Sequence, residues 1–389
     1  MTHDHPQARE HDPGRPQDQP SDEPGIRIGS LFSVPILLMP SWFVIAALVT
    51  FFYARNLAGV PGLSTASTYL VGLCAALLLL FSVFLHEVAH AVAARSVGTA
   101  PTRIVLDLWG GHTAFEREMT TPGRSAFVSL VGPATNAAIA GIGLLIRPAV
   151  PDGVPRLLLE GMILTNAFVA VFNALPGLPL DGGRALEALV WKITGRRTTG
   201  ALVAGWIGRA VAVALVLWAL LPLLQGRTPS LFTMLWTLLV AGTLWRGASG
   251  ALEMARFTDR SESLTVAELT RPAAVVRAGS SVGAGLQAAE AIEARAVVLL
   301  GADGRPWALM DPAALTQVPE QRLGTTPAEA VALALPPHAL VPQSLGGDPL
   351  IRFLQANPAA EYVVLDAQGG VAGVLFTEDV VDRLGGRKS

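Results

Sequence analysis

The chain has 389 residues, enough for two or three domains, and 51% of them are hydrophobic while only 15% are charged. The hydrophobic fraction is higher, and the charged fraction lower, than in ordinary soluble domains. This composition predicts that long apolar runs lie in lipid. A net charge of −2 does not supply the basic face that nucleic acid requires, so no nucleic-acid partner is expected. Cys74 is the only cysteine, which excludes a disulfide framework or a cysteine-rich zinc finger within one chain.

Residues 1–27 are polar, rich in proline, aspartate and histidine, and show no apolar periodicity. They predict a disordered cytoplasmic tail rather than a signal peptide, because no apolar segment with a cleavage site follows Met1. A solvated tail also explains His3, His5 and His11 more simply than a metal site does.

Six apolar segments follow, each near or above the ~20 residues that a helix needs to cross a bilayer. They cover residues 33–54, 66–94, 124–148, 157–176, 200–225 and 229–251. Basic residues gather before the first segment, after the second, after the fourth and after the sixth, and the opposite loops hold only Arg55, Arg147, Arg156 and Arg227. Because cytoplasmic loops carry the excess of basic residues, both termini are expected in the cytoplasm of a cell whose inner or plasma membrane holds the chain.

Between the second and third segments, two β-prone stretches flank Gly110-Gly111, which predicts a hairpin over residues 104–115. Its apolar content predicts that it dips into the membrane edge. An exposed edge there would offer main-chain partners to an unwound substrate segment.

After residue 257, charges become regular, and short β-like stretches alternate with helical ones. The stretches that begin at Ala296 and Tyr362 are similar and predict a repeated β-α-β-type unit. The predicted architecture is therefore an all-α polytopic membrane domain of six transmembrane helices with a membrane-associated β-hairpin (residues 28–256), followed by a cytosolic α+β tandem domain (residues 257–389).

The second apolar segment contains His86-Glu-Val-Ala-His90, an H-E-x-x-H motif on a predicted helix. Positions i and i+4 share one helix face, so both imidazoles can reach one Zn²⁺. Glu87 lies beside them, where it can accept a proton from a water molecule that the metal activates. Ionisable side chains within a membrane helix favour a functional interpretation over a helix end exposed to headgroup water.

Zinc in a catalytic site needs a third protein ligand, and the best candidate is Asp181 in Leu180-Asp-Gly-Gly-Arg184. The fourth segment runs toward the cytoplasm and ends here, so Asp181 is expected at the membrane depth of His90. Asp-Gly is also common turn chemistry. Glu160 is expected at the opposite membrane face, and Glu187 on the following helix.

Together, the H-E-x-x-H motif and the later N-x-x-P-x-x-P-L-D-G-G motif resemble the site-2 protease family of intramembrane zinc metalloproteases, over residues 28–256. The resemblance implies one Zn²⁺ per chain held by His86, His90 and Asp181, and Glu87 as the catalytic glutamate. It also implies that Asn173 positions the substrate or stabilises the oxyanion. Gly132-Pro-Ala-Thr-Asn136 matches a family G-P-x-x-N element, in which close helix packing is favoured over catalysis for Asn136. The implied substrate is a single-pass transmembrane protein.

The C-terminal repeats resemble tandem cystathionine-β-synthase (CBS) modules, which implies an adenine nucleotide as ligand. In the second copy, Thr377 and Asp379 match ribose-contacting positions. The first copy, aligned as Met310-Asp311-Pro312, lacks both polar groups. A pair that only dimerises the chain or gates the site is an equal alternative to nucleotide sensing.

Three other interpretations stay open from the sequence. A CBS-gated transporter or channel would explain the helices and the repeats but would leave both motifs as coincidence. A zinc protease of the prenyl-protein type needs a Glu or His ligand on a later helix, and no well-placed candidate is visible. A catalytically dead scaffold would not need all of the matched residues. For His112, a polar residue of the hairpin is favoured over a further metal ligand.

Overall fold

The computed structural model describes residues 25–58, 62–117 and 119–385. Most of the predicted tail, with His3, His5 and His11, lies outside these residues. The chain divides into two compact units. One contains the chain up to Leu175 together with Leu180–Ala185, and the other contains Pro176–Pro179 and the chain from Leu186 onward.

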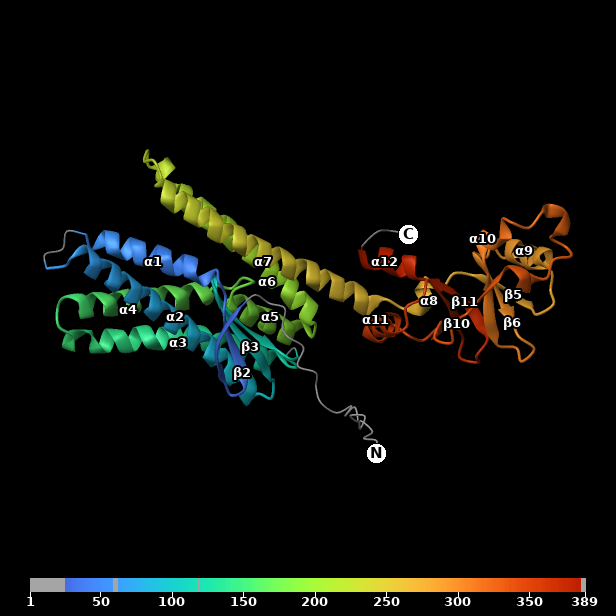
Figure 1. The fold of residues 1–389 in the computed structure, drawn as a ribbon, viewed down its shortest axis with the longest axis horizontal. Coiled ribbons are helices and arrows are strands. Elements are labelled where there is room, and N and C mark those ends of the chain that lie inside the picture. The colour runs from blue at the N-terminus through green and yellow to red at the C-terminus, as the bar shows by residue number, and fades with distance from the viewer. Residues whose placement is uncertain (1–24, 59–61, 118, 386–389) are drawn as a thin grey trace, which may run out of the picture. The chain divides into compact units, whose positions relative to one another are not determined.

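Four helices form most of the first unit. They are α1 (Trp42–Asn56), α2 (Thr65–Ser96), α3 (Pro122–Ile146, followed by the 3-10 turn Arg147–Ala149) and α4 (Val154–Asn173). Helix α2 contacts the other three and occupies the centre of this layer (Figure 1). It begins where the Ser64 side chain accepts a hydrogen bond from the backbone N–H of Ser67 at 3.2 Å, and it ends before Gly98, whose φ of +84° is left-handed.

Side-chain size along these helices follows the pattern of a membrane protein. Buried positions are occupied mainly by small residues, such as Gly72 and Ala76 of α2 and Ala140 of α3. Large apolar side chains face outward instead, and Leu145 and Leu164 are 81% and 73% exposed. Close helix contacts through small residues and an apolar outer surface are expected where lipid, rather than water, surrounds the bundle.

Five helices of the described residues are long and apolar enough to cross a membrane: α2, Pro122–Ala149, α4, α6 (Arg197–Leu224) and α7 (Leu231–Ser263). The prediction of six spanning helices is not confirmed at its first segment. Residues Val34–Leu38 of that apolar run form a strand, and the helix that remains, α1, has 15 residues. At 1.5 Å per residue it is about 22 Å long, which is short of a ~30 Å hydrocarbon core.

A four-stranded sheet accompanies the helices, with strand order β1-β2-β3-β4. The strands are β1 (Ile26–Leu31), β2 (Val34–Leu38), β3 (Pro101–Asp107) and β4 (Gly110–Phe115). Strands β2 and β3 pair in parallel, and the other two pairs are antiparallel. The predicted hairpin is confirmed as β3–β4, but β1 and β2 correct the prediction of an all-α membrane domain with a hairpin alone.

The turn of the β3–β4 hairpin lies two residues earlier than the Gly110-Gly111 pair predicted. Asp107 pairs with Gly110 and Leu106 with Gly111, so Leu108 and Trp109 form the turn, and both glycines belong to β4. Ile104 in β3 is fully buried, which shows that this strand is covered on its inner face. Among the described residues, strand β4 is an edge strand of this sheet.

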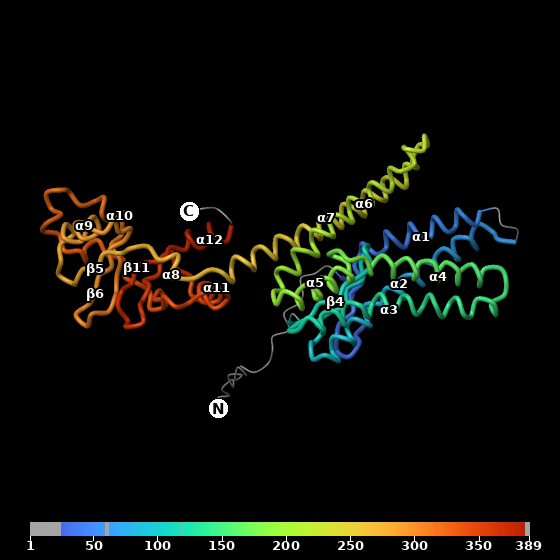
Figure 2. The backbone as a smooth tube through the Cα atoms, turned by 180° about the vertical axis from the view of Figure 1, so that it is seen from behind, coloured from blue at the N-terminus to red at the C-terminus, as the bar shows by residue number. Residues whose placement is uncertain are grey.

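In the second unit, helices α6 and α7 pack against each other (Figure 2). Helix α5 (Asp181–Thr194) precedes them, with its first turn belonging to the other unit. The loop between α4 and α5 comes very close to α6, because a Cβ on Gly208 would lie 2.0 Å from the carbonyl oxygen of Leu178. Helix α7 continues to Ser263, beyond the predicted domain boundary at residue 256.

The rest of the second unit is an α+β region, as predicted. Its elements are α8 (Val266–Leu269), β5 (Ala273–Arg277), α9 (Val282–Ala291), β6 (Ala296–Leu300), β7 (Pro306–Met310), α10 (Pro312–Leu315), the 3-10 turns Glu320–Arg322 and Ala328–Val331, β8 (Ala332–Ala334), β9 (Leu340–Pro342), α11 (Gly347–Ala356), β10 (Glu361–Leu365), β11 (Val371–Phe376) and α12 (Thr377–Gly385). The strands form two sheets, β5-β6-β7-β8 and β11-β10-β9.

Each sheet contains the same unit, a parallel strand pair joined by a helix and then an antiparallel hairpin. The register corrects the alignment proposed from the sequence. Leu309 pairs with Val298 as Val374 pairs with Val363, so positions differ by 374 − 309 = 65 residues. At this spacing Pro312 matches Thr377 and Ala314 matches Asp379, so the first copy still lacks both polar groups.

Candidate active site

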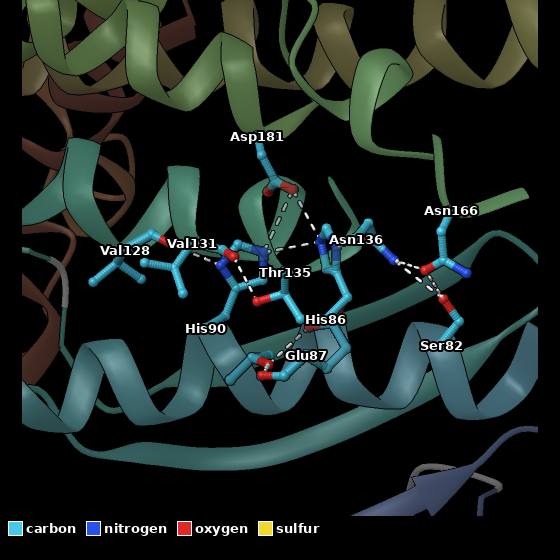
Figure 3. Close-up of polar contacts among 11 residues, drawn as sticks. Ser82, His86, Glu87, His90, Val128, Val131, Thr135, Asn136, Asn166 and Asp181 are labelled. Atoms are coloured by element: carbon cyan, nitrogen blue, oxygen red, sulfur yellow. Dashed lines mark hydrogen bonds and ion pairs between the residues drawn. The ribbon is translucent and has the colours of Figure 1, made fainter. Parts of the chain in front are cut away.

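Three side chains from two distant parts of the first unit meet at one point (Figure 3). Helix α2 presents His86 and His90 one turn apart, and Asp181 approaches them from the first turn of α5. The Nε2 atoms of the two histidines are 3.0 Å apart, and Asp181 Oδ2 lies 3.1 Å from His86 Nε2 and 3.4 Å from His90 Nε2. Both histidines are buried.

This arrangement fits a zinc ion by its donor set and by its spacing. Two imidazole nitrogens and a carboxylate oxygen are the ligand types of catalytic zinc, and ligands held at 2.0–2.1 Å in a tetrahedron lie roughly 3.3 Å from one another. The observed separations of 3.0–3.4 Å are close to that edge length. The three residues that the two motifs predicted as ligands are therefore placed where one ion could bind all of them.

Gly132 of α3 supplies the space beside the histidines. A Cβ at this position would lie 2.3 Å from His90 Nε2 and 2.6 Å from His86 Nε2, the two atoms that would hold the metal. Any side chain at residue 132 would therefore occupy the site. Gly182, next to Asp181, allows a close approach of two backbone segments, since a Cβ there would lie 2.3 Å from the carbonyl oxygen of Ala174.

Asp181 carries the negative charge that a dication requires. Burial alone would raise the pKa of its carboxyl group, but the two imidazoles beside it, His86 and His90, outweigh burial and hold the pKa below its ordinary value. The group is therefore ionised at neutral pH.

Glu87 is buried next to this site and is held by the sheet. Thr113 of β4 donates a hydrogen bond to Glu87 Oε2 at 2.8 Å, which engages only one of the two carboxylate oxygens. A Cβ on Gly111 would lie 3.0 Å from Glu87 Cγ, so the glycine lets β4 approach the helix. Side chains alternate between the two faces of a strand, so Gly111 and Thr113 face α2 while His112 is exposed on the other face.

The other residues weighed from the sequence lie apart from this group. Glu160 pairs with Arg147 at 2.6 Å, and Glu187 pairs with Arg197 at 2.9 Å. Asn173 is the half-buried last residue of α4, and among the described residues its side chain has no hydrogen bond to the histidines or to Asp181.

In the second C-terminal repeat, both candidate ribose-binding side chains already have partners within the chain. Thr377 Oγ1 donates to the carbonyl oxygen of Ala359 at 2.6 Å. Arg271 donates to both oxygens of Asp379, at 2.9 and 3.1 Å. These hydrogen bonds from Arg271 lower the pKa of Asp379. A ribose would therefore compete with Arg271 for this carboxylate.

Sequence reasoning missed the hydrogen-bonding roles of four polar residues around the candidate metal site. Thr113 donates to Glu87, and Asn136 Oδ1 accepts a hydrogen bond from Nδ1 of His86, in addition to the close packing that the sequence favoured for Asn136. Ser82 and Asn166 in turn contact Asn136. Isolated polar residues within apolar spans are the signal that could have found the last three, because such groups are costly in lipid.

Comparison with known proteins shows the family to which the chain belongs. Residues 148–217 match the model of "Peptidase family M50". "Putative zinc metalloprotease sll0528" of Synechocystis is 34% identical over 263 residues, which are 66% of this chain and 68% of that protein. Rip3 of Mycobacterium tuberculosis, named in the same way, is 34% identical over 206 residues, 52% of each chain. "Zinc metalloprotease MJ0392" of Methanocaldococcus jannaschii is 29% identical over 50% of this chain and 54% of that protein.

Solved structures show weaker likenesses. The site-2 protease from Methanocaldococcus jannaschii has a TM-score of 0.43 at 23% identity, over 59% of this chain and 95% of that chain. The CBS domain of a bacterial CNNM/CorC family Mg²⁺ transporter has a TM-score of 0.29 at 20% identity, over 36% of this chain and 90% of that chain. Scores this low leave the family assignment to the sequence relatives and the site.

A bundle of apolar spanning helices around a buried group of two histidines and a carboxylate, with an adjacent glutamate, is the arrangement expected of a membrane metallopeptidase. The chain belongs to peptidase family M50, the site-2 protease family of zinc metalloproteases.

Proposed function

We propose that the chain hydrolyses a peptide bond within or near a transmembrane helix of a membrane-protein substrate, at a zinc ion held by His86, His90 and Asp181. The observation that supports this most is the meeting of these three side chains, with 3.0–3.4 Å between donor atoms, inside a bundle of membrane-spanning helices. When bound there, zinc would supply Lewis acidity toward a carbonyl group and would lower the pKa of a water molecule.

Residues of the chain would provide proton transfer and stabilisation of the oxyanion. Glu87 accepts a proton from water and returns it to the leaving amine, as a general base and then a general acid. Thr113 keeps the Glu87 carboxylate oriented through Oε2. We assign Asn173, eight residues before Asp181, the role of donating a hydrogen bond to the oxyanion. A substrate helix pairs its amides in its own hydrogen bonds, so it must unwind locally before one of these amides can react.

Substitution of Glu87 by Gln tests the reaction. The amide keeps the size of the side chain but cannot accept the proton, so we expect full zinc content and a loss of cleavage of at least about 10²-fold. The measurement is mass spectrometry of products after the purified protein is reconstituted with single-pass membrane proteins that carry a Gly or Pro within their span. Asn173→Ala should keep zinc and slow cleavage by about 10²–10³-fold. Cleavage at the wild-type rate by Glu87→Gln would contradict the assignment.

We also propose that the C-terminal repeats regulate this activity by binding an adenine nucleotide in the second repeat, with Thr377 and Asp379 contacting the ribose, or by joining two copies of the chain. The internal repeat and its buried core support a module of this kind. Equilibrium binding of AMP to the full chain tests the nucleotide, and sedimentation in detergent tests the dimer. We further propose that both termini face the cytoplasm, which protease protection in oriented vesicles would test.

A further inference from the structure

Three buried polar side chains extend from His86 into the membrane-spanning bundle, away from the metal site (Figure 3). His86 Nδ1 contacts Asn136 Oδ1 of α3. The Asn136 amide donates to Asn166 Oδ1 of α4 at 2.8 Å and to Ser82 Oγ of α2 at 3.1 Å, and Ser82 donates to the same Asn166 oxygen. Asn136, Asn166 and Ser82 are only 0%, 1% and 4% exposed.

At the far end of this chain of hydrogen bonds, the orientation of the Asn166 amide is fixed. Asn166 Nδ2 donates to the backbone carbonyl of Met162 at 2.8 Å, and a carbonyl oxygen can only accept. Asn166 must therefore turn its NH₂ group to Met162 and its oxygen to Asn136. The opposite orientation would place two oxygens against each other at Met162.

That orientation propagates back to the metal site. Because Asn166 offers an oxygen, Asn136 must turn its NH₂ group toward it, which leaves Asn136 Oδ1 facing His86. An oxygen at Nδ1 requires His86 to carry its proton there, so the Nε2 lone pair faces Asp181 and the metal site. His90 reaches the same tautomer directly, since its Nδ1 donates to the Val128 carbonyl oxygen at 2.7 Å.

We propose that Asn166 is a positioning residue for the metal site: through Asn136 and assisted by Ser82, it fixes the tautomer and ring orientation of His86. This inference rests on the proposed zinc site and adds a role for residues that touch neither zinc nor substrate. A buried amide with unmade hydrogen bonds is costly in lipid, so loss of Asn166 would release Asn136 to rotate and would weaken its hold on His86.

Zinc affinity of the full-length protein in detergent tests the proposal, measured by competition with a chelator of known affinity. Asn166→Leu should weaken zinc binding about 10- to 100-fold, the usual effect of losing a partner behind a metal-binding histidine. It should also change the visible absorption spectrum of the Co²⁺-substituted protein. Thr165→Val, which alters the neighbouring hydroxyl on α4, is the matched control and should leave both unchanged.

Combining Asn166→Leu with a second substitution, Asn136→Asp, distinguishes a positioning role of Asn166 from a packing role. In Asn136→Asp, a carboxylate accepts from His86 Nδ1 with either oxygen and needs no partner to orient it. Asn166→Leu added to Asn136→Asp should then cost less than about threefold in zinc affinity. If Asn166→Leu does not fold, Ser82→Ala serves as a milder variant in the same test. It should weaken zinc binding less, and this loss of zinc affinity should also disappear when Asn136→Asp is present.

The outcomes distinguish this inference from the proposed function. Wild-type affinity and an unchanged Co²⁺ spectrum in Asn166→Leu and Ser82→Ala would overturn the positioning role and leave the zinc protease standing. Equal losses with and without Asn136→Asp would also overturn it, because they would show a packing defect. A wild-type protein that binds no zinc would instead remove the proposed function itself.

Discussion

Gly132 lies between the two histidines of the metal site at a distance that leaves no room for a side chain. A methyl group there would overlap the Nε2 atoms of His86 and His90. Both rings are held from behind, by Asn136 and by the Val128 carbonyl, so they cannot turn away without breaking a buried hydrogen bond. The glycine of the G-P-x-x-N element is therefore required if the two Nε2 atoms are to hold a metal ion.

Gly132→Ala should lower zinc content from one ion per chain to less than about a tenth, because even the smallest side chain displaces the ligand atoms. Metal analysis of the purified variant measures this. Gly141→Ala is the matched control on the same helix, since a Cβ there meets nothing within 4 Å, and it should keep its zinc. A Gly132→Ala protein with full zinc would show that the ligand geometry is wrong.

The meeting of His86, His90 and Asp181 could be predicted from the sequence because each lies in a short motif with its own chemistry. Spacing within H-E-x-x-H placed His86 and His90 on one face, and helix direction placed Asp181 at their depth. Thr113, Ser82 and Asn166 carry no such motif. Their roles depend on contacts between elements that are 26 to 84 residues apart in sequence, such as Thr113 with Glu87 and Ser82 with Asn166, which spacing alone does not determine.

Among the secondary-structure elements, long apolar helices were the most predictable and the first apolar run the least. A continuous run from residue 33 to 54 is compatible with one spanning helix, but Phe32 and Ser33 adopt left-handed φ values of 52° and 71° and start a strand instead. The parallel pairing of β2 with β3, residues 36–38 with 104–106, stabilises that strand. This is a tertiary effect that local hydropathy does not contain.

The contact between Arg271 and Asp379, at the start of α12, gives a test of nucleotide binding by the second repeat. If a ribose uses Asp379, then Arg271→Ala should strengthen AMP binding by removing the competitor, whereas Asp379→Asn should weaken it about tenfold or more through loss of hydrogen bonds to a charged group. Both variants break the same ion pair, so equal destabilisation cannot explain opposite shifts. Calorimetric titration of the full chain with AMP measures them, and Glu378→Gln is the neighbouring control. Loss of affinity in both variants would contradict direct ribose contact.

At the scale of the whole molecule, the chain joins a metallopeptidase of family M50 to a repeated α+β region. The composition predicted both parts, because apolar runs end and regular charges begin near residue 257. The boundary is less sharp in the structure, where α7 runs on to Ser263 and the two compact units alternate between Leu175 and Leu186, in the loop before Asp181 and the first turn of α5. Helix continuity depends on packing as well as composition, so composition could not locate the boundary.

The zinc content of the purified protein tests the central claim most directly. The wild-type chain should hold one zinc ion, and His86→Ala and Asp181→Ala should each hold less than about a tenth of that, because two remaining ligands bind too weakly to survive purification. His112→Ala, an exposed histidine on the far face of β4, should keep the full complement. Stoichiometric zinc in both ligand variants would show that the ion is bound elsewhere and that the proposed chemistry is wrong.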